Sequence, residues 1–382
     1  MDLVQSIISK RCLKKLVGEE RDQKLFPEHG KVLLPVDLIR TVAIILVILL
    51  HASIEPAPAV DIMSSEGVQL WWASNVYASL ASPAVPLFIM LTGALLLQPS
   101  KVNEPLKVFF KKRLSRIGLP FLFWGGAYFA WRVFVNGEVL TSGSILQGVL
   151  AGPYFHFWFL YLLLGLYLFT PLLRVIVAYA DWKLIKYFLI VWFVGTALVP
   201  LFGLYENLIG PALWFKQNVF LLSGMMGYFV LGAYMVKWRL RSSILILILA
   251  SSLVFTISGT YFLVGTLGER FSQFFYDASS VSIVIASIAL FLLLLTVPAK
   301  QVENQSRINR FLHLVSQNTL PIYLFHVMVL EVLQKGYLGF KISVTTMNPI
   351  VEIPFITVIA LLVSLVVIIP LKKIPYVKRI VG

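Results

Sequence analysis

Long apolar runs recur along almost the whole chain, and they constrain its fold more than any other feature. Runs such as Ser243 to Val264 and Pro354 to Leu371 are about as long as the roughly 20 residues that a helix needs to cross a bilayer. Only 13% of the 382 residues are charged, against about 25% in a soluble domain. The strand-period alternation that a transmembrane barrel requires is absent. The sequence therefore predicts an all-α integral membrane protein.

We expect a bundle of about ten transmembrane helices. The predicted spans cover residues 32–53, 78–98, 117–136, 155–175, 184–204, 218–236, 243–265, 279–297, 315–334 and 353–372. The apolar runs leave no long polar segment for a separate soluble domain. The chain is thus divided into a basic tail (1–31), a transmembrane domain (32–372) and a short second tail (373–382). Because no small-residue cleavage site follows the first run, we expect it to be a retained span.

Basic residues fall in alternate segments between these spans. The first tail and the segment from Lys101 to Arg116 are rich in lysine and arginine, whereas the loop at 136–154 has neither. The loop at 54–77 carries Glu55, Asp61 and Glu66 but no basic residue. By the positive-inside rule, both termini are predicted to be cytoplasmic. The net charge of +14 then favours contact with membrane lipids and argues against a nucleic-acid partner.

Two ionisable residues lie within the first predicted span, Arg40 and His51. Such residues are costly in a bilayer and indicate a functional site by default. Eleven residues separate them by about 16 Å along a helix and place them on the same face. Asp37 lies three residues before Arg40 and could pair with it. A purely structural alternative is that Arg40 extends to the headgroups and that His51 lies at the interface without a task.

A second basic element, KKRLSRIGLP, precedes the third predicted span. Arg113 and Arg116 share a helical face at the predicted cytoplasmic surface. Guanidinium groups are well suited to bind phosphates because they offer forked donors and a permanent charge. The alternative is that the cluster only anchors the span on the cytoplasmic side.

These elements together resemble the membrane-bound acyltransferase 3 family. The signature is Arg40, ten intervening residues and then His51 in the first span, followed by Arg113-x-x-Arg116 before the third. PLFIMLTGALLLQ (residues 86–98) resembles the second-span segment, with Thr92 where a serine is usual. FHFWFLYLLLGLYLFTPLL (155–173) and SQNTLPIYLFHVMVLE (316–331) resemble two later motifs. The likeness extends from about residue 37 to residue 370, without the extracytoplasmic hydrolase-like domain that some members carry.

The resemblance implies an O-acyltransferase of the bacterial inner membrane that acts on cell-surface glycans or lipid-linked sugars. It implies that an acyl group, most often acetyl, comes from cytosolic acyl-CoA as a co-substrate, with no permanently bound cofactor. Arg113 and Arg116 would bind the phosphates of coenzyme A, and Arg40 would steady its arm or the thioester. An imidazole suits general-base catalysis at neutral pH, so His51 would deprotonate the acceptor hydroxyl. A covalent acyl-histidine remains an alternative.

The remaining histidines carry weaker expectations. His156 precedes the fourth span among aromatic residues, where an interfacial belt is as reasonable as acceptor binding. His326 and Tyr323 lie in the ninth span and could support the site or contact the acceptor. Glu55, Asp61 or Glu66 could orient His51, whereas His313 is given no role. No two histidines or acids have the spacing of a metal site on one helix.

Two readings without enzyme activity also remain open. The first is a transporter or flippase for a lipid-linked glycan, which buried Arg and His residues and proline-broken helices would suit. Transporters often show two similar halves, and this sequence shows no such repeat. The second is a sensor or assembly protein that has kept the fold without the activity.

Overall fold

The computed structural model describes residues 34–54, 65–198, 216–268, 272–298, 306–337, 339 and 348–382. Within these ranges the chain is helical and contains no strand. The helices are α3 (Val36–Ile54), α4 (Ser65–Ala81), α5 (Ala84–Leu96), η1 (Pro99–Lys101), α6 (Leu106–Phe134), α7 (Ser142–Ala151), η2 (Phe155–Phe157), α8 (Trp158–Tyr179), α9 (Trp182–Phe193), the π-helix η3 (Val194–Leu198), α11 (Lys216–Met235), α12 (Ser242–Leu267), α13 (Val281–Leu295), α15 (Arg307–Gln317), α16 (Thr319–Lys335), α17 (Pro349–Leu371) and α18 (Pro375–Val381). The predicted tail 1–31 lies outside the described residues.

The all-helical prediction is confirmed, and the described part of each predicted span falls on a helix or a pair of helices. Five stretches are both long and apolar enough to cross a membrane: Val36–Ile54, Gly67–Leu96, Phe155–Tyr179, Ser242–Leu267 and Pro349–Leu371. Large apolar side chains are exposed on the outer faces of several of them, including Leu247 (66%), Phe262 (66%) and Val366 (71%). Such faces require an apolar surrounding, as a bilayer provides. The protein is therefore a helical membrane protein, and the number of spans and their orientation stay predictions.

Several helices occur where the sequence was expected to form loops or tails. The predicted loop at 54–77 contains most of α4, so that prediction was wrong. α4 mixes Ser, Asn and Gln with its apolar residues, which hides it from a search for uniformly apolar runs. The predicted outer loop at 136–154 contains α7, and the C-terminal tail contains α18. Trp124 of α6 donates a hydrogen bond to the carbonyl of Val381 (3.2 Å), which holds α18 against the bundle.

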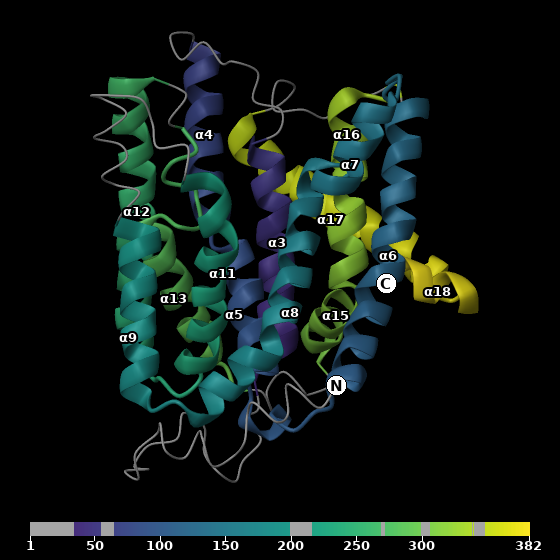
Figure 1. Cartoon of the computed structure of the whole chain (residues 1–382). Coiled ribbons are helices and arrows are strands. Elements are labelled where there is room, and N and C mark those ends of the chain that lie inside the picture. Colours follow the sequence, from purple (N-terminus) through teal and green to yellow (C-terminus); the bar gives the residue numbers. More distant parts are fainter. Residues whose placement is uncertain are drawn as a thin grey trace.

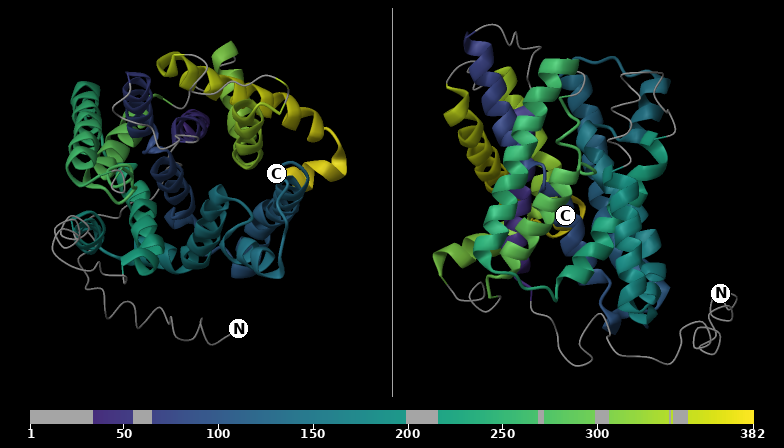
Figure 2. Two further views of the ribbon diagram at one scale, coloured as in Figure 1. Left: turned by 90° about the horizontal axis from the view of Figure 1, so that it is seen from above. Right: turned by 90° about the vertical axis from the view of Figure 1, so that its left-hand side faces the viewer.

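α3 is the central helix of the bundle (Figure 1). It contacts α4, α5, α15, α16 and α17, so residues along its length face elements from both halves of the chain. Viewed from above, α17 and α18 run along one edge of the bundle (Figure 2). We call the end that carries the first residues of α3 and α6 the basic end, which is at the bottom of Figure 1, and the other the opposite end.

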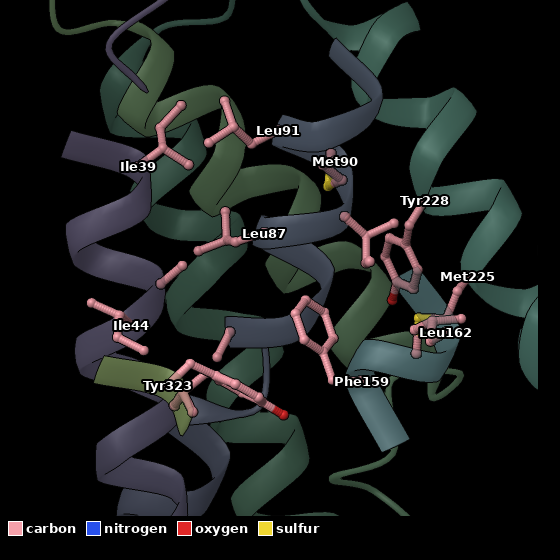
Figure 3. Packing of buried hydrophobic residues seen from close by; sticks show 14 of the residues in the cluster. Ile39, Ile44, Leu87, Met90, Leu91, Phe159, Leu162, Met225, Tyr228 and Tyr323 are labelled. Atoms are coloured by element: carbon pink, nitrogen blue, oxygen red, sulfur yellow. The ribbon is translucent and has the colours of Figure 1, made fainter. Parts of the chain in front are cut away.

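The backbones of helices α5 and α11 approach each other closely because each helix has a glycine that lies against the backbone of the other. A Cβ on Gly93 would lie 1.8 Å from the carbonyl oxygen of Phe229, and one on Gly232 would lie 2.0 Å from that of Met90. Small residues allow such contact between membrane helices. Figure 3 shows the surrounding core, in which Leu87 and Met90 of α5 lie between side chains of α3 and α11. Gly93 belongs to the family-like segment 86–98, so part of that motif is a packing requirement.

Candidate functional site

His51 and His326 come together near the opposite end of the bundle. His51 lies on the last turn of α3 and His326 lies in the middle of α16, and their rings are nearly parallel, with centroids 5.0 Å apart. Nδ1 of His51 is 2.7 Å from Nε2 of His326. His326 is fully buried, whereas His51 is partly exposed. The pair therefore has one buried member and one accessible member.

The hydrogen bonds around His326 determine which nitrogens carry protons. Its Nδ1 lies 2.7 Å from the carbonyl oxygen of Tyr323 and 3.2 Å from that of Ile322. Because carbonyl oxygens only accept, Nδ1 is the protonated nitrogen, and Nε2 of the neutral ring must accept. The donor to Nε2 is then the Nδ1–H of His51. The Nε2 of His51 is left with a lone pair, which is the arrangement that a general base requires.

Aromatic residues enclose this histidine pair. The ring of Phe155 meets His51 edge-on at 5.3 Å between centroids. The ring of His156 is 5.8 Å from that of His326 and is fully buried, so the structure places it behind the pair. Tyr323 donates a hydrogen bond from its hydroxyl to the carbonyl of His156 (2.5 Å). Tyr323 thus joins α16 to η2 and also supplies the carbonyl that anchors His326.

A buried carboxylate, Glu331, lies further along α16. It accepts hydrogen bonds from Nε1 of Trp131 (2.6 Å), from the hydroxyl of Tyr154 and from Nζ of Lys335 (2.8 Å). These bonds tie α6 and the segment before η2 to α16. We had not predicted this role, although an acid inside a predicted span is a recognisable signal. Glu331 supports the frame of the site.

Three arginines gather at the basic end. Arg113 lies with its Cζ 5.8 Å from the ring centroid of Tyr167 and 5.5 Å from that of Phe109. Arg40 of α3 interacts electrostatically with both Arg116 and Tyr167. Among the described residues, none of these three arginines has a carboxylate within ion-pair distance. An unbalanced positive cluster of this kind attracts an anion.

Asp37 interacts electrostatically with Arg40, as the spacing suggests, but its direct partner is a different residue. Asp37 Oδ2 instead lies 2.7 Å from Nδ1 of His313, whose Nε2 is 2.6 Å from the side-chain amide of Gln317. The i, i+3 spacing brings Asp37 close to Arg40, but α15 presents a better-placed donor. His313 is 276 residues away in sequence, so local spacing could not have found it. Arg40 keeps the electrostatic attraction of Asp37 without a direct ion pair to it.

A second unpredicted group lies beside the arginines. Arg174 of α8 is buried and donates to the carbonyl of Leu96 (2.7 Å) and to Oε2 of Glu104 (3.0 Å). Burial raises the pKa of Glu104, but hydrogen bonds from Lys112 and Arg174 outweigh this and leave the pKa below its usual value. For Lys101, burial and then the charges of Arg174 and Arg113 lower the pKa. The Arg174–Glu104 pair fastens the segment between α5 and α6.

The structure brings some predicted site residues together and separates others. His51, His326, Tyr323 and His156 form one cluster, and Arg40, Arg113 and Arg116 form another at the basic end. Among the acids expected near His51, Glu55 and Asp61 lie outside the described residues. Within the part of the chain that the structure describes, no group of three His, Cys, Asp or Glu residues could hold a metal ion.

Comparison with known proteins identifies the family. A family model described as an acyltransferase domain, that of acyltransferase family 3, matches residues 34–369. No curated protein and no solved structure matches the chain. The matched region includes both clusters, the histidine pair and the arginines. The chain therefore belongs to the acyltransferase 3 family and is a membrane-embedded acyltransferase.

Proposed function

We propose that this protein transfers an acyl group from cytosolic acyl-CoA to a hydroxyl of a cell-surface glycan or lipid-linked sugar. The proposed acyl group is acetyl. The observation that carries the proposal is the His51–His326 pair, because its hydrogen bonds leave Nε2 of the partly exposed His51 unprotonated. The same helix carries Arg40 three turns earlier, beside Arg113 and Arg116. One helix thus links an anion-binding cluster to a base.

The donor enters at the basic end in this proposal. Coenzyme A carries several negative charges, which match the three arginines, since none of them forms a direct ion pair with a described carboxylate. Arg113 and Arg116 bind its phosphates, and their forked donors suit that geometry. From Arg40 to His51 is about 16 Å along α3, a distance that the extended pantetheine arm covers. The thioester then lies beside His51, with Arg40 steadying the arm.

The chemical step uses His51 as general base. Nε2 of His51 removes the proton of the acceptor hydroxyl as its oxygen attacks the thioester carbonyl carbon. The new C–O bond forms, the C–S bond breaks, and the departing thiolate takes the proton from His51 to give free coenzyme A. His326 keeps the Nδ1–H of His51 in place through this cycle, much as an orienting acid does in a serine protease triad. Tyr323 and His156 position His326.

The test compares envelope glycans from cells of a bacterial host that lack the gene. One set is complemented with the native chain, one with His51→Ala and one with Thr266→Ala, all at equal expression. Thr266 is the control because it is exposed on α12, a helix whose main contacts are with α13 and α4. Mass spectrometry should find ester-linked acetyl groups with the native chain and the control, and none with His51→Ala.

The identity of the acyl donor is then tested by measuring the release of free coenzyme A from acetyl-CoA in isolated membranes. Release that depends on His51 supports the proposal. Acylated glycan without consumption of acetyl-CoA would mean a different donor. Equal acylation by the native chain and His51→Ala would refute the role of His51. If the gene instead affects only the export of a glycan, the protein is a transporter and the acyltransfer proposal is refuted.

A further inference from the structure

A cavity of about 480 Å³ lies at the opposite end of the bundle, beside the histidine pair. One face of α7 forms its wall, with Ser144, Gln147, Gly148 and Ala151. These residues recur at the i, i+3, i+4, i+7 spacing of a single helical face. The turn from Gly152 to Phe155 and Arg132 of α6 complete the lining. α7 lies near the top of the molecule in Figure 1.

The other face of α7 is apolar and exposed. Ile145, Leu146, Val149 and Leu150 have exposed fractions between 43% and 69%. A short helix with one polar and one apolar face is typical of a position in the membrane interface. α7 therefore turns its polar face toward the cavity and its apolar face outward, as a helix at a membrane interface does.

The lining favours a neutral, hydroxyl-bearing ligand. The charge of Arg132 is balanced by Glu138, whose Oε2 lies 2.7 Å from Nη2 and 2.8 Å from Nε. The side-chain amide of Gln147 makes no hydrogen bond with any described residue, so it can both donate and accept. Tyr154 and Phe155 add aromatic surface. Amides and aromatic rings together suit the two sides of a sugar ring, hydroxyls and C–H groups.

Phe155 connects this cavity to the catalytic base. It lines the cavity, is 43% exposed, and has its ring 5.3 Å from the ring of His51. One side chain thus lies between the cavity and the imidazole. A hydroxyl that reaches past Phe155 arrives at His51 from the side opposite the arginine cluster.

We propose that this cavity, defined by α7, Arg132 and residues 152–155, binds the neutral sugar of the acceptor. The inference rests on the proposed function, since it assigns the acceptor side of that reaction. Gln147 orients the sugar by hydrogen bonds. Phe155 controls which hydroxyl reaches His51.

The test fills the cavity with a large side chain introduced at Ala151, an exposed residue of the lining. Ala151→Trp places an indole in the cavity, and Leu150→Trp places the same group on the lipid-facing side of α7 as the matched control. Membranes containing each protein receive [1-¹⁴C]acetyl-CoA, and the initial rate of label transfer to the endogenous glycan is measured. Ala151→Trp should lower this rate about 10-fold or more. Gln147→Leu, which loses hydrogen bonds at similar volume, should lower it about 2- to 10-fold.

A second measurement distinguishes the cavity from the donor side. The purified proteins in phospholipid nanodiscs, without glycan, should hydrolyse acetyl-CoA slowly and at equal rates. Unchanged hydrolysis with slower transfer supports the cavity as the acceptor site, and organic extraction shows whether the labelled sugar is lipid-linked or polymeric. Equal transfer by Ala151→Trp and Leu150→Trp would overturn the inference. If the native chain neither hydrolyses acetyl-CoA nor transfers label, the proposed function is wrong and the inference falls with it.

Discussion

The contact between α5 and α11 should not tolerate a single added methyl group. In Gly93→Ala the new Cβ would lie 1.8 Å from the carbonyl oxygen of Phe229, where at least 3.0 Å is required. Both atoms belong to helix backbones, so no side chain can rotate away. The helices must separate by more than 1 Å, and a gap of about 0.5–1 Å already forfeits a quarter to a half of each van der Waals contact.

We expect Gly93→Ala to lower the free energy of unfolding by about 2–3 kcal/mol or more. Gly126→Ala on α6 is the matched control, because a Cβ there meets nothing within 4 Å. Replacing glycine by alanine in an open helical position stabilises by about 0.5–1 kcal/mol. The same substitution should therefore have opposite signs at the two positions. Thermal unfolding in detergent, followed by tryptophan fluorescence, measures both.

Equal midpoints for Gly93→Ala and Gly126→Ala would refute this packing. Gly232→Ala provides an independent check, since its Cβ would lie 2.0 Å from the carbonyl oxygen of Met90 in the same interface. If Gly232→Ala alone were destabilising, the helices would cross at a different point from the one described here.

Three further predictions concern the basic end. Replacing Arg113 and Arg116 by glutamine should raise the KM for acetyl-CoA about 10- to 100-fold through lost charge-assisted hydrogen bonds, with a weaker salt dependence; an unchanged KM would place the phosphates elsewhere. Arg174→Met should destabilise by about 1–3 kcal/mol, measured by thermal unfolding, because the Leu96 carbonyl loses this donor and Glu104 keeps only Lys112. The lowered pKa of Glu104 means that its contribution is complete above about pH 4.3 and is lost as the pH falls through the folded value. The difference in melting temperature between the native protein and Glu104→Gln should shrink over that range, and a constant difference would contradict it.

The sequence predicted the helices well because the bilayer imposes their length and polarity. It failed at α4, where polar residues in a helix that packs within the bundle resemble a loop. It also failed at α7, where ten residues are too few to span. Arg40, His51 and His326 could be selected one by one because each is an ionisable group in an apolar run. That His51 contacts His326, across 275 residues, depends on the packing of α3 against α16 and is not encoded in any local spacing.

The direct partner of Asp37 is His313 rather than Arg40 for a physical reason of the same kind. Helical spacing brings two side chains within reach, but it does not exclude a third that approaches from another helix. His313 on α15 approaches Asp37 in this way. Asp37 therefore forms its ion pair with His313 and acts on Arg40 only through its longer-range charge. The local spacing thus predicted that Asp37 lies near Arg40, whereas the packing of α15 against α3 determines that Asp37 pairs with His313.

The choice of histidine to orient His51 follows from its place within an apolar bundle. A carboxylate would orient the ring equally well but would add a charge, which costs about 2.5–3.5 kcal/mol inside a membrane. A neutral His326 fixes the same tautomer without that cost. If orientation is its task, His326→Gln should retain activity within about 10-fold, since its amide oxygen can still accept from Nδ1–H of His51. His326→Leu, which cannot accept, should lose about 10²–10⁴-fold in kcat with an unchanged KM for acetyl-CoA.

The comparison of these two variants decides between orientation and proton relay. Both have similar volume, so both should fold, and thermal unfolding checks this directly. A relay needs a ring that can lose one proton while gaining another, which neither leucine nor glutamine provides. Equal, severe loss in His326→Gln and His326→Leu would therefore mean that the proton of the acceptor passes through His326. Recovery in the glutamine variant alone would mean that His326 only holds His51 and that His51 is the base.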